Sequence, residues 1–352
     1  METRSMGSVK EWLIKTNQYH EYHNEHELRR AQMQKHGSMP LFFHDHMYVG
    51  NVTVGTPGKF AEKGQTVFLM MDTGSSNVWM IDAMCHSLGC NGIYGNDRRK
   101  FNSTKSSSFS SENTTLNLQY RDGWCKGPLV TDTISLGGLQ IEQQGFVNVM
   151  DIELAFGFMY FDGMLGLGWP NLSMGEVPPP MQNILPSLDS PVFTIWNDGK
   201  FNNHANAGLI TFGAIDTVNC HSEINYVPLT SETYWQFAID GFSVGNYSEH
   251  KIEQAISDSG TLWFGVPKSV MDAVVKETHA DFFQIFNFYF VDCSTIEIQP
   301  DLVFTINGVK YIVTPQEYIK EIGLGRKFVS ALSLLKNYIH NCHRCGKIQH
   351  HS

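Results

Sequence analysis

The chain has 352 residues, of which 42% are hydrophobic and only 17% charged, and its formal net charge is −10 at pH 7. A chain this apolar and this poor in charge is not a disordered polymer, and its length allows two ordinary domains or one large β-rich unit. No basic stripe accompanies the acidic balance, so we expect no nucleic-acid partner. No run of 18 apolar residues occurs, so we expect no membrane span.

Residues 1–46 differ in composition and in hydrophobic spacing from the rest of the chain. Their segment EWLIKTNQYHEYHNEHELRRAQMQK combines helix-forming residues, apolar positions at helical spacing and a basic cluster. This pattern is typical either of a solvated amphipathic helix or of a detachable inhibitory segment. The segment lacks the apolar stretch of an export signal, so we expect the true N-terminus, with its signal, to be missing.

From Met47 onward, short β-rich runs alternate with turns. MYVGNVTVGTP, QTVFLMMDTG and GPLVTDTISLGG are examples, and the same texture returns in YWQFAIDGFSVG and PDLVFTINGVKYIV. Strands at this spacing predict an all-β fold of the sandwich or barrel type. The strongest helical pattern is PKSVMDAVVKETHADFF, with Pro267 at a suitable first helical position.

A repeated sequence motif divides the chain into two parts. VFLMMDTGSS at 67–76 and EQAISDSGTL at 253–262 both place apolar residues before Asp-(Thr/Ser)-Gly-(Ser/Thr), with Asp72 and Asp258 in equivalent positions. One such motif alone is equally well explained as a surface turn, because Asp, Gly and Ser are turn residues. Two copies, each at the end of an apolar strand, predict one loop in each of two lobes.

Paired carboxylates in such loops have a specific chemistry. Two carboxylates at hydrogen-bond distance cannot both ionise, so they share one proton. The ionised member can take a proton from a water between them, while the protonated member donates to a substrate carbonyl. The pair therefore acts as general base and general acid together, and we expect no metal and no other cofactor.

The motifs also carry a family resemblance. VFLMMDTGSSNVWM, FDGMLGLGWP at 161–170 and AISDSGT resemble successive parts of the pepsin-like aspartic proteases, peptidase family A1, and TFGAIDTVNC is closest to nematode digestive or lysosomal members. The resemblance runs from about Tyr48 to about Tyr318. It implies a bilobal pepsin-like fold, in which two β-barrel-like lobes hold the active site in the cleft between them.

The resemblance implies a function as well. We expect an aspartic endopeptidase that cleaves next to hydrophobic residues at acid pH and is made as a zymogen. Its partners would be peptide or protein substrates and its own prosegment, residues 1–46, as inhibitor, and the chain would be a monomer. We place the N-terminal lobe at 47–226, the C-terminal lobe at 227–320 and a divergent tail at 321–352.

Each site residue is carried over by its place in these motifs. Asp72 and Asp258 are expected to be the catalytic pair. Ser75, Thr261 and Trp79 are expected to support this pair. Tyr120 corresponds to the tyrosine of the flap, the hairpin that closes over substrate, and with Phe161, Met164, Tyr234 and Ile256 it is expected to contact the substrate. Cys85 and Cys90 are expected to form a disulfide. The flap tip reads YRDGW, where the family has glycine directly after the tyrosine, so we expect altered flap mobility and substrate choice.

Other features indicate the localisation of the protein. Five N-x-Ser/Thr sequons are candidates for glycosylation and, with the small cysteine loop, indicate a secreted or lysosomal protein. The sequons begin at Asn51, Asn102, Asn113, Asn171 and Asn246.

The C-terminal part departs from the family pattern. No second strand like FDGMLGLG follows Asp258, and FVSALSLLKNYI at 328–339 has a helical pattern instead. We therefore expect an incomplete C-terminal lobe with an exposed strand edge. This leaves an alternative function, a catalytically inactive pepsin-like peptide-binding protein. CHRC at 342–345, among several histidines, raises a third one, a zinc-dependent interaction module.

Overall fold

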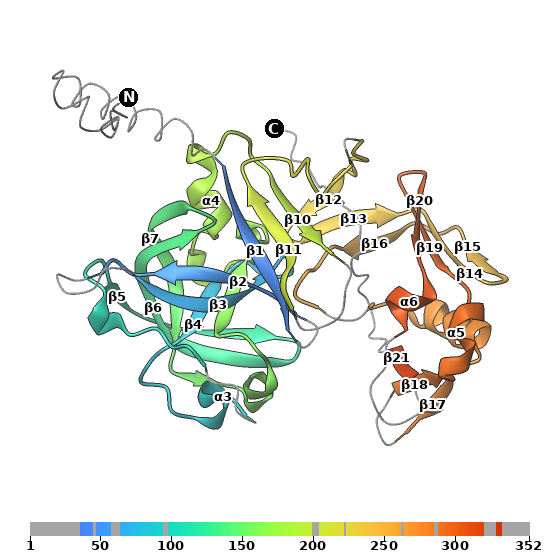
Figure 1. Ribbon diagram of the computed structural model, residues 1–352, viewed down its shortest axis with the longest axis horizontal. Helices are drawn as coiled ribbons and strands as arrows, with labels where there is room; N and C mark the ends of the chain where they lie inside the picture. Colours follow the sequence, from blue (N-terminus) through green and yellow to red (C-terminus); the bar gives the residue numbers. More distant parts are fainter. Residues whose placement is uncertain are drawn as a thin grey trace, which may run out of the picture.

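The computed structural model describes residues 36–44, 47–57, 64–93, 98–198, 204–221, 223–261, 264–284, 288–319 and 329–332. Over these residues the chain is mostly β-strand, with few and short helices, and its first and last parts form two separate lobes (Figure 1). The all-β, bilobal fold predicted from the sequence is confirmed. None of the helices described is long and apolar enough to cross a membrane.

The N-terminal lobe is built on an 11-stranded sheet with the order β10-β11-β1-β2-β3-β9-β4-β7-β6-β5, and β8 pairs with β6 off this path. Its strands are β1 (Gly37–His44), β2 (Met47–Val54), β3 (Gln65–Asp72), β4 (Val78–Ile81), β5 (Ser110–Tyr120), β6 (Gly123–Leu136), β7 (Leu139–Val149), β8 (Asp151–Ile152), β9 (Gly163–Gly166), β10 (Phe193–Asn197) and β11 (His204–Phe212). Short helices connect them, among them α3 (Leu88–Asn91), α4 (Pro180–Ile184) and the 3-10 turns η2 (Leu154–Phe158), η3 (Pro170–Leu172) and η4 (Met174–Glu176).

Strand β9 lies between β3 and β4 and supports the end of β3. It runs parallel to β3, with Asp72 opposite Gly166, and antiparallel to β4. Beyond the strand, the backbone N–H of Leu167 donates to the carbonyl of Asp72 at 2.7 Å. The FDGMLGLG motif is thus the strand that fixes the backbone of Asp72.

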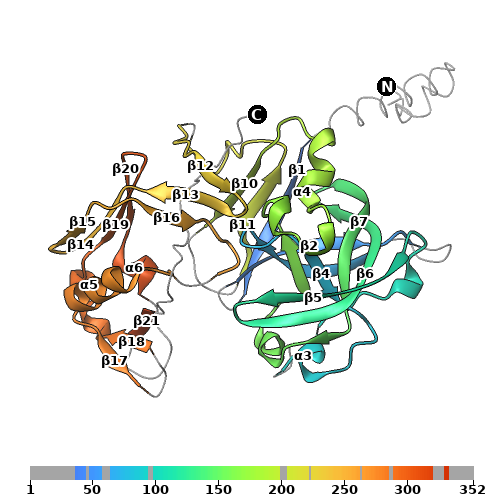
Figure 2. The same ribbon diagram turned by 180° about the vertical axis from the view of Figure 1, so that it is seen from behind.

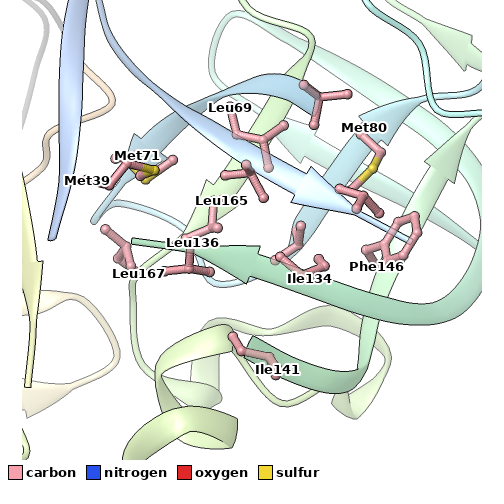
Figure 3. Packing of buried hydrophobic residues seen from close by; sticks show 14 of the residues in the cluster. Met39, Leu69, Met71, Met80, Ile134, Leu136, Ile141, Phe146, Leu165 and Leu167 are labelled. Atoms are coloured by element: carbon pink, nitrogen blue, oxygen red, sulfur yellow. The ribbon is translucent and has the colours of Figure 1, made fainter. Parts of the chain in front are cut away.

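The core of this lobe lies between the layers of the folded sheet. Strand β6 shows the period of two expected of a strand with one buried face, because its residues alternate between buried and half-buried from Val130 to Leu136. Figure 3 shows how the side chains from this and the neighbouring strands interdigitate. The labelled residues are Met39, Leu69, Met71, Met80, Ile134, Leu136, Ile141, Phe146, Leu165 and Leu167.

The C-terminal lobe contains three smaller sheets around a second core. Their strands are β12 (Leu229–Glu232), β13 (Trp235–Ile239) and β16 (Glu253–Ile256); β14 (Gly241–Val244), β15 (Tyr247–Glu249), β19 (Leu302–Ile306) and β20 (Val309–Val313); and β17 (Asp281–Phe283), β18 (Phe288–Val291) and β21 (Val329–Leu332). Strands β10–β13 and β16 lie between the two lobes in both views (Figures 1 and 2). Helices α5 (Lys268–Thr278) and α6 (Pro315–Tyr318) pack in the distal part of the lobe.

The predicted helix over α5 is confirmed, with Val270, Ala273 and Val274 on its buried face. Pro267 stands one position earlier than predicted, at the N-cap, where its ψ of 152° is extended rather than helical.

The helical interpretation of 328–339 is wrong for its first part. Val329–Leu332 form β21, which pairs antiparallel with β18. Pairing with a neighbouring strand overrides a helical pattern in the sequence, because local propensity is a weak preference.

Strands β3 and β16, which lead to the two aspartates, differ in their partners. Strand β3 pairs with both β2 and β9, whereas β16 has β13 as its sheet partner within the part of the chain that the structure describes. The expected incompleteness of the C-terminal lobe stays a prediction.

Truncation of a core aromatic residue tests this packing. Phe146 is 1% exposed and meets Phe101 edge-on, with ring centroids 5.6 Å apart. Phe146→Ala leaves a cavity and should lower the free energy of unfolding by about 3–5 kcal/mol, measured by urea denaturation. Ile298→Ala, at a position that is 82% exposed, should change it by less than about 0.5 kcal/mol. Equal losses in the two variants would contradict the assignment of the core.

Candidate active site

Asp72 and Asp258 are held by the same hydrogen-bond pattern in two equivalent loops. One oxygen of each carboxylate accepts the backbone N–H of the glycine two residues on, and the other accepts the hydroxyl three residues on. The donors are Gly74 (2.9 Å) and Ser75 for Asp72, and Gly260 (2.8 Å) and Thr261 (2.8 Å) for Asp258. Ser75 and Thr261 thus each donate to Oδ2 of their own aspartate.

The two loops are joined by reciprocal hydrogen bonds across the cleft. The hydroxyl of Thr73 donates to the carbonyl of Ser257 at 2.9 Å and accepts the backbone N–H of Ser259 at 2.8 Å. In return, the backbone N–H of Thr73 donates to the hydroxyl of Ser259 at 3.0 Å, and that hydroxyl donates to the carbonyl of Met71 at 2.6 Å. The serine in the second motif keeps every bond that needs a hydroxyl.

Close approach of the loops requires the two motif glycines. A Cβ atom at Gly260 would clash with Oδ1 of Asp72, and one at Gly74 would clash with the carboxyl of Asp258. Any side chain at either position would force the carboxylates apart.

The environment of the pair favours a retained proton. Asp72 is 5% exposed, and burial raises its pKa to about 8. The charge of Asp258 and a hydrogen bond with it contribute to this rise in pKa, while the hydrogen bonds from Ser75 and Gly74 oppose it. The pair can therefore hold one shared proton across the acid range, as acid–base catalysis by two carboxylates requires.

Tyr120 is the last residue of β5, in the hairpin that β5 forms with β6, and lies near Asp72. Its ring packs against Trp79 and Phe156, with centroids 6.4 Å and 6.1 Å away. Burial raises the pKa of the Tyr120 phenol well above its usual range, and nearby Cys125 and Asp72 add to the shift. The N–H of Trp79 and the hydroxyl of Ser75 partly offset the rise, so the phenol lies close to both groups.

The indole of Trp79 is completely buried behind this tyrosine. Its Nε1 lies close enough to favour the Tyr120 phenolate, yet has no hydrogen-bond partner within 3.5 Å among the described residues. Trp79 therefore supports the flap by packing against the Tyr120 ring rather than by a hydrogen bond.

A cleft of about 320 Å³ opens between the lobes above the two aspartates. Of the residues expected at the substrate, Tyr120, Met164, Tyr234 and Ile256 line it. Further lining residues come from elements far apart in the sequence, and methionine is frequent among them. They include Met47, Met70, Leu118, Phe156, Met159, Leu172 and Met174. Sequence reasoning missed these residues, because the motifs that contain Met47 and Met70 do not show which of their apolar side chains face the cleft, and the others lie outside the active-site motifs.

Phe161 does not line the cleft. Its side chain is 1% exposed and packs against Trp79 and Phe156, with ring centroids 5.9 Å and 6.0 Å away. Phe156, from η2, takes the position in the wall that we expected for Phe161. Phe161 forms a second layer that holds this wall in place.

The flap tip brings charge to the rim of the cleft. Arg121 and Asp122 both line it, and Nε of Arg121 lies 3.1 Å from Oδ1 of Asp122. These are the residues by which YRDGW departs from the family pattern, so the departure lies at the cleft itself.

The remaining predicted features lie away from the cleft. Cys85 and Cys90 form the predicted disulfide, whereas Cys125 is buried as a free thiol. Four sequon asparagines are exposed, and Asn102 is half-buried with its oxygen bound to Thr104 of its own sequon. The described residues contain no group of histidine, cysteine and acidic side chains able to hold a metal. The CHRC segment of the zinc hypothesis lies outside these residues.

Comparison with known proteins gives a consistent result. Residues 47–331 match the family model of the eukaryotic aspartyl proteases. Aspartic protease 17 of Caenorhabditis elegans is 44% identical over 333 residues, which cover 92% of this chain and 82% of that protein. Aspartic protease 1 of the same organism is 43% identical over 330 residues, with the same coverage. Gastricsin of Homo sapiens is 30% identical over 328 residues, which cover 90% of this chain and 81% of that protein.

This site has two equivalent Asp-(Thr/Ser)-Gly loops, one from each β lobe, that meet at the cleft. Such a pair of loops defines an aspartic peptidase. The chain belongs to the eukaryotic aspartyl protease family, and its predicted likeness to nematode members is confirmed. Its activity is that of the family, an aspartic endopeptidase that hydrolyses peptide bonds.

The raised pKa of Asp72 predicts how stability depends on pH. The folded protein holds this proton up to about pH 8, whereas the unfolded chain releases it near 3.8, the ordinary pKa of an aspartate. The associated stability is therefore fully present below about pH 3.8 and lost as pH rises toward 8. Melting temperatures should fall over this range, and Asp72→Asn should flatten the fall, because asparagine has no proton to lose. A slope unchanged by the substitution would contradict the assigned shift.

Proposed function

We propose that this endopeptidase is acid-active and uses Asp72 and Asp258 as its catalytic pair. The observation that carries the proposal is the set of reciprocal bonds between the loops, Thr73 with Ser257 and Ser259, which hold the two carboxylates close enough to share a proton. Acid favours the reaction, because the pair must retain one proton and lose the other.

The pair acts on a water held between the carboxylates. The ionised carboxylate takes a proton from this water, and the water oxygen forms a bond to the carbon of the scissile carbonyl. The protonated carboxyl gives its proton to the carbonyl oxygen at the same time, so a tetrahedral diol forms without a charged oxygen. The proton taken from water then passes to the leaving nitrogen and the C–N bond breaks, while one hydroxyl of the diol returns its proton to the carboxylate that had donated one, which leaves a carboxylic acid and a free amine.

The cleft favours extended peptides with hydrophobic side chains beside the cleaved bond. Its lining is largely apolar, and the aromatic ring of Tyr120 lines it near Asp72. Methionine side chains are unbranched and flexible, so a wall of Met47, Met70 and Met164 can adapt to side chains of different shape.

We further propose that the enzyme is made as a zymogen whose removable segment ends before Gly37. Strand β1 pairs on one side with β2 and on the other with β11, within the main sheet. Removing the segment up to residue 46, the boundary expected from the sequence, would extract a strand that is bonded on both edges. A cut upstream of Gly37 leaves the sheet intact.

A secreted or lysosomal monomer fits these features. The Cys85–Cys90 disulfide belongs to an oxidising compartment, and Asn51, Asn113, Asn171 and Asn246 are exposed for glycosylation.

An activity assay tests the catalytic pair. The chain should cleave denatured globin between pH 3 and 7, with inhibition by a statine-type compound. Asp72→Asn and Asp258→Asn should each lower kcat by about 10²–10⁴-fold, because each removes one member of the acid–base pair. Asp301→Asn, which changes an exposed aspartate of the same lobe as Asp258, is the matched control and should retain full activity.

The same assay separates the enzyme from the alternative of an inactive peptide-binding protein. A folded chain that binds the statine-type compound but cleaves nothing at any pH would support the binding protein and overturn the proposed activity.

N-terminal sequencing of the acid-treated protein tests the zymogen boundary. We expect a new N-terminus between the basic cluster of residues 29–35 and Gly37, since strand β1 stays in the sheet. A stable, active product that begins at Met47 would contradict this boundary, and incubation with the statine-type inhibitor shows whether the cut is autocatalytic.

A further inference from the structure

Trp235 is the first residue of β13 and lies where the two lobes meet, because its side chain bonds a residue of the N-terminal lobe. We infer that Trp235 is a positioning residue that joins the backbone of Asp72 to that of Asp258 and so sets the separation of the two carboxylates. The inference rests on the proposed role of this pair, and Trp235 itself touches neither carboxylate in the contacts described.

The side chain of Trp235 reaches the N-terminal lobe. Its indole N–H donates to the carbonyl of Leu167 at 2.9 Å. The N–H of Leu167 in turn donates to the carbonyl of Asp72 at 2.7 Å, and the next N–H, from Gly168, donates to the carbonyl of Ser75 at 2.8 Å. One residue therefore stands between the indole and the backbone of the first aspartate.

The main chain of Trp235 reaches the other loop. Its carbonyl accepts the N–H of Ser257 at 3.0 Å, and Ser257 directly precedes Asp258. This bond continues the antiparallel pairing of β13 with β16, in which Gln236 lies opposite Ile256. Through its side chain and its main chain, one residue is bonded to the supports of both aspartates.

Aromatic rings of the N-terminal lobe hold the indole in its orientation. Trp169 lies 5.1 Å and Phe193 5.3 Å from the Trp235 ring, the latter at an interplanar angle of 80°. The backbone N–H of Trp169 also donates to the carbonyl of Thr233 at 3.3 Å. The indole N–H thus has little freedom to move away from Leu167.

A second connection between the loops has a mechanical consequence. The Thr73–Ser259 bonds join the loops directly, while Trp235 joins them through Ser257 on one side and Leu167 on the other. A single connection would let the loops pivot about it, whereas two separated connections fix distance and angle together. Catalysis depends on such precision, because a misplacement of about 1 Å can lower a rate by about 10²-fold.

The test compares two identical substitutions. Trp235→Phe removes the indole N–H and keeps an aromatic ring. Trp196→Phe makes the same change at another half-buried tryptophan of the interlobe strands, whose ring makes no hydrogen bond among the described contacts. We expect Trp235→Phe to lower kcat at least about tenfold with KM changed less than about twofold, and Trp196→Phe to leave both near the parent values.

The pH profile distinguishes positioning from general damage. Carboxylates that move apart share their proton less strongly, so the alkaline limb of the Trp235→Phe profile should move to lower pH. The other ionisable groups facing the pair, Tyr120 and, at the rim, Arg121 and Asp122, are unchanged in the variant. A Trp235→Phe profile that superimposes on the parent profile, with kcat equal to that of Trp196→Phe, would overturn the inference.

A measurement without turnover keeps this outcome separate from the proposed activity. The fall in melting temperature between pH 4 and 8 should be shallower in Trp235→Phe than in the parent and in Trp196→Phe, because the less strongly shared proton is lost at lower pH. An inactive parent would overturn the proposed activity, while an equal slope in all three proteins would overturn the role of Trp235. If Trp235→Phe does not unfold cooperatively, Trp235→Tyr, which also lacks the indole N–H, replaces it with the same expectations.

Discussion

Repulsion between two neighbouring carboxylates, one of them buried, is the constraint on which the rest of this structure depends. Two such groups do not stay together by themselves, because burial and like charge both oppose their ionisation. Asp72 and Asp258 remain in place because separate hydrogen bonds hold each one, and because Thr73 and Ser259 bind the opposite loop. Strand β9 then fixes the backbone of Asp72, and Trp235 connects the two lobes close to both aspartates.

The parts of the site that lie in one short motif could be predicted from the sequence. The Asp-x-Gly-x-type loops place a carboxylate, a glycine N–H and a hydroxyl within four consecutive residues, so Ser75 and Thr261 reach their aspartates whatever the remaining chain does. The β-rich texture predicted the fold for a similar reason, because alternation in a strand such as β6 is a local property.

The rest depends on packing between distant elements, which a motif does not contain. Whether Phe161 or Phe156 faces the substrate depends on how η2 folds against Trp79, and both are aromatic residues beside the same strand. Apart from Met164, which lies in a family motif, the cleft methionines come from separate elements, and the sequence does not show that they meet. Val329–Leu332 carry a helical pattern, yet they pair with β18.

The position of β1 also constrains the order in which the protein can be built. Pro40 pairs with Leu209, so the first strand of the sheet meets β11 only after nearly all of the N-terminal lobe has been synthesised. At ribosomal speeds of about 5–20 residues per second, that delay is roughly 10–30 seconds. Contacts so distant in sequence form slowly, because the loop must close before any pairing stabilises it. During this interval one edge of β1 is open to pairing with other nascent chains, which makes this strand a point of vulnerability to misassembly during synthesis.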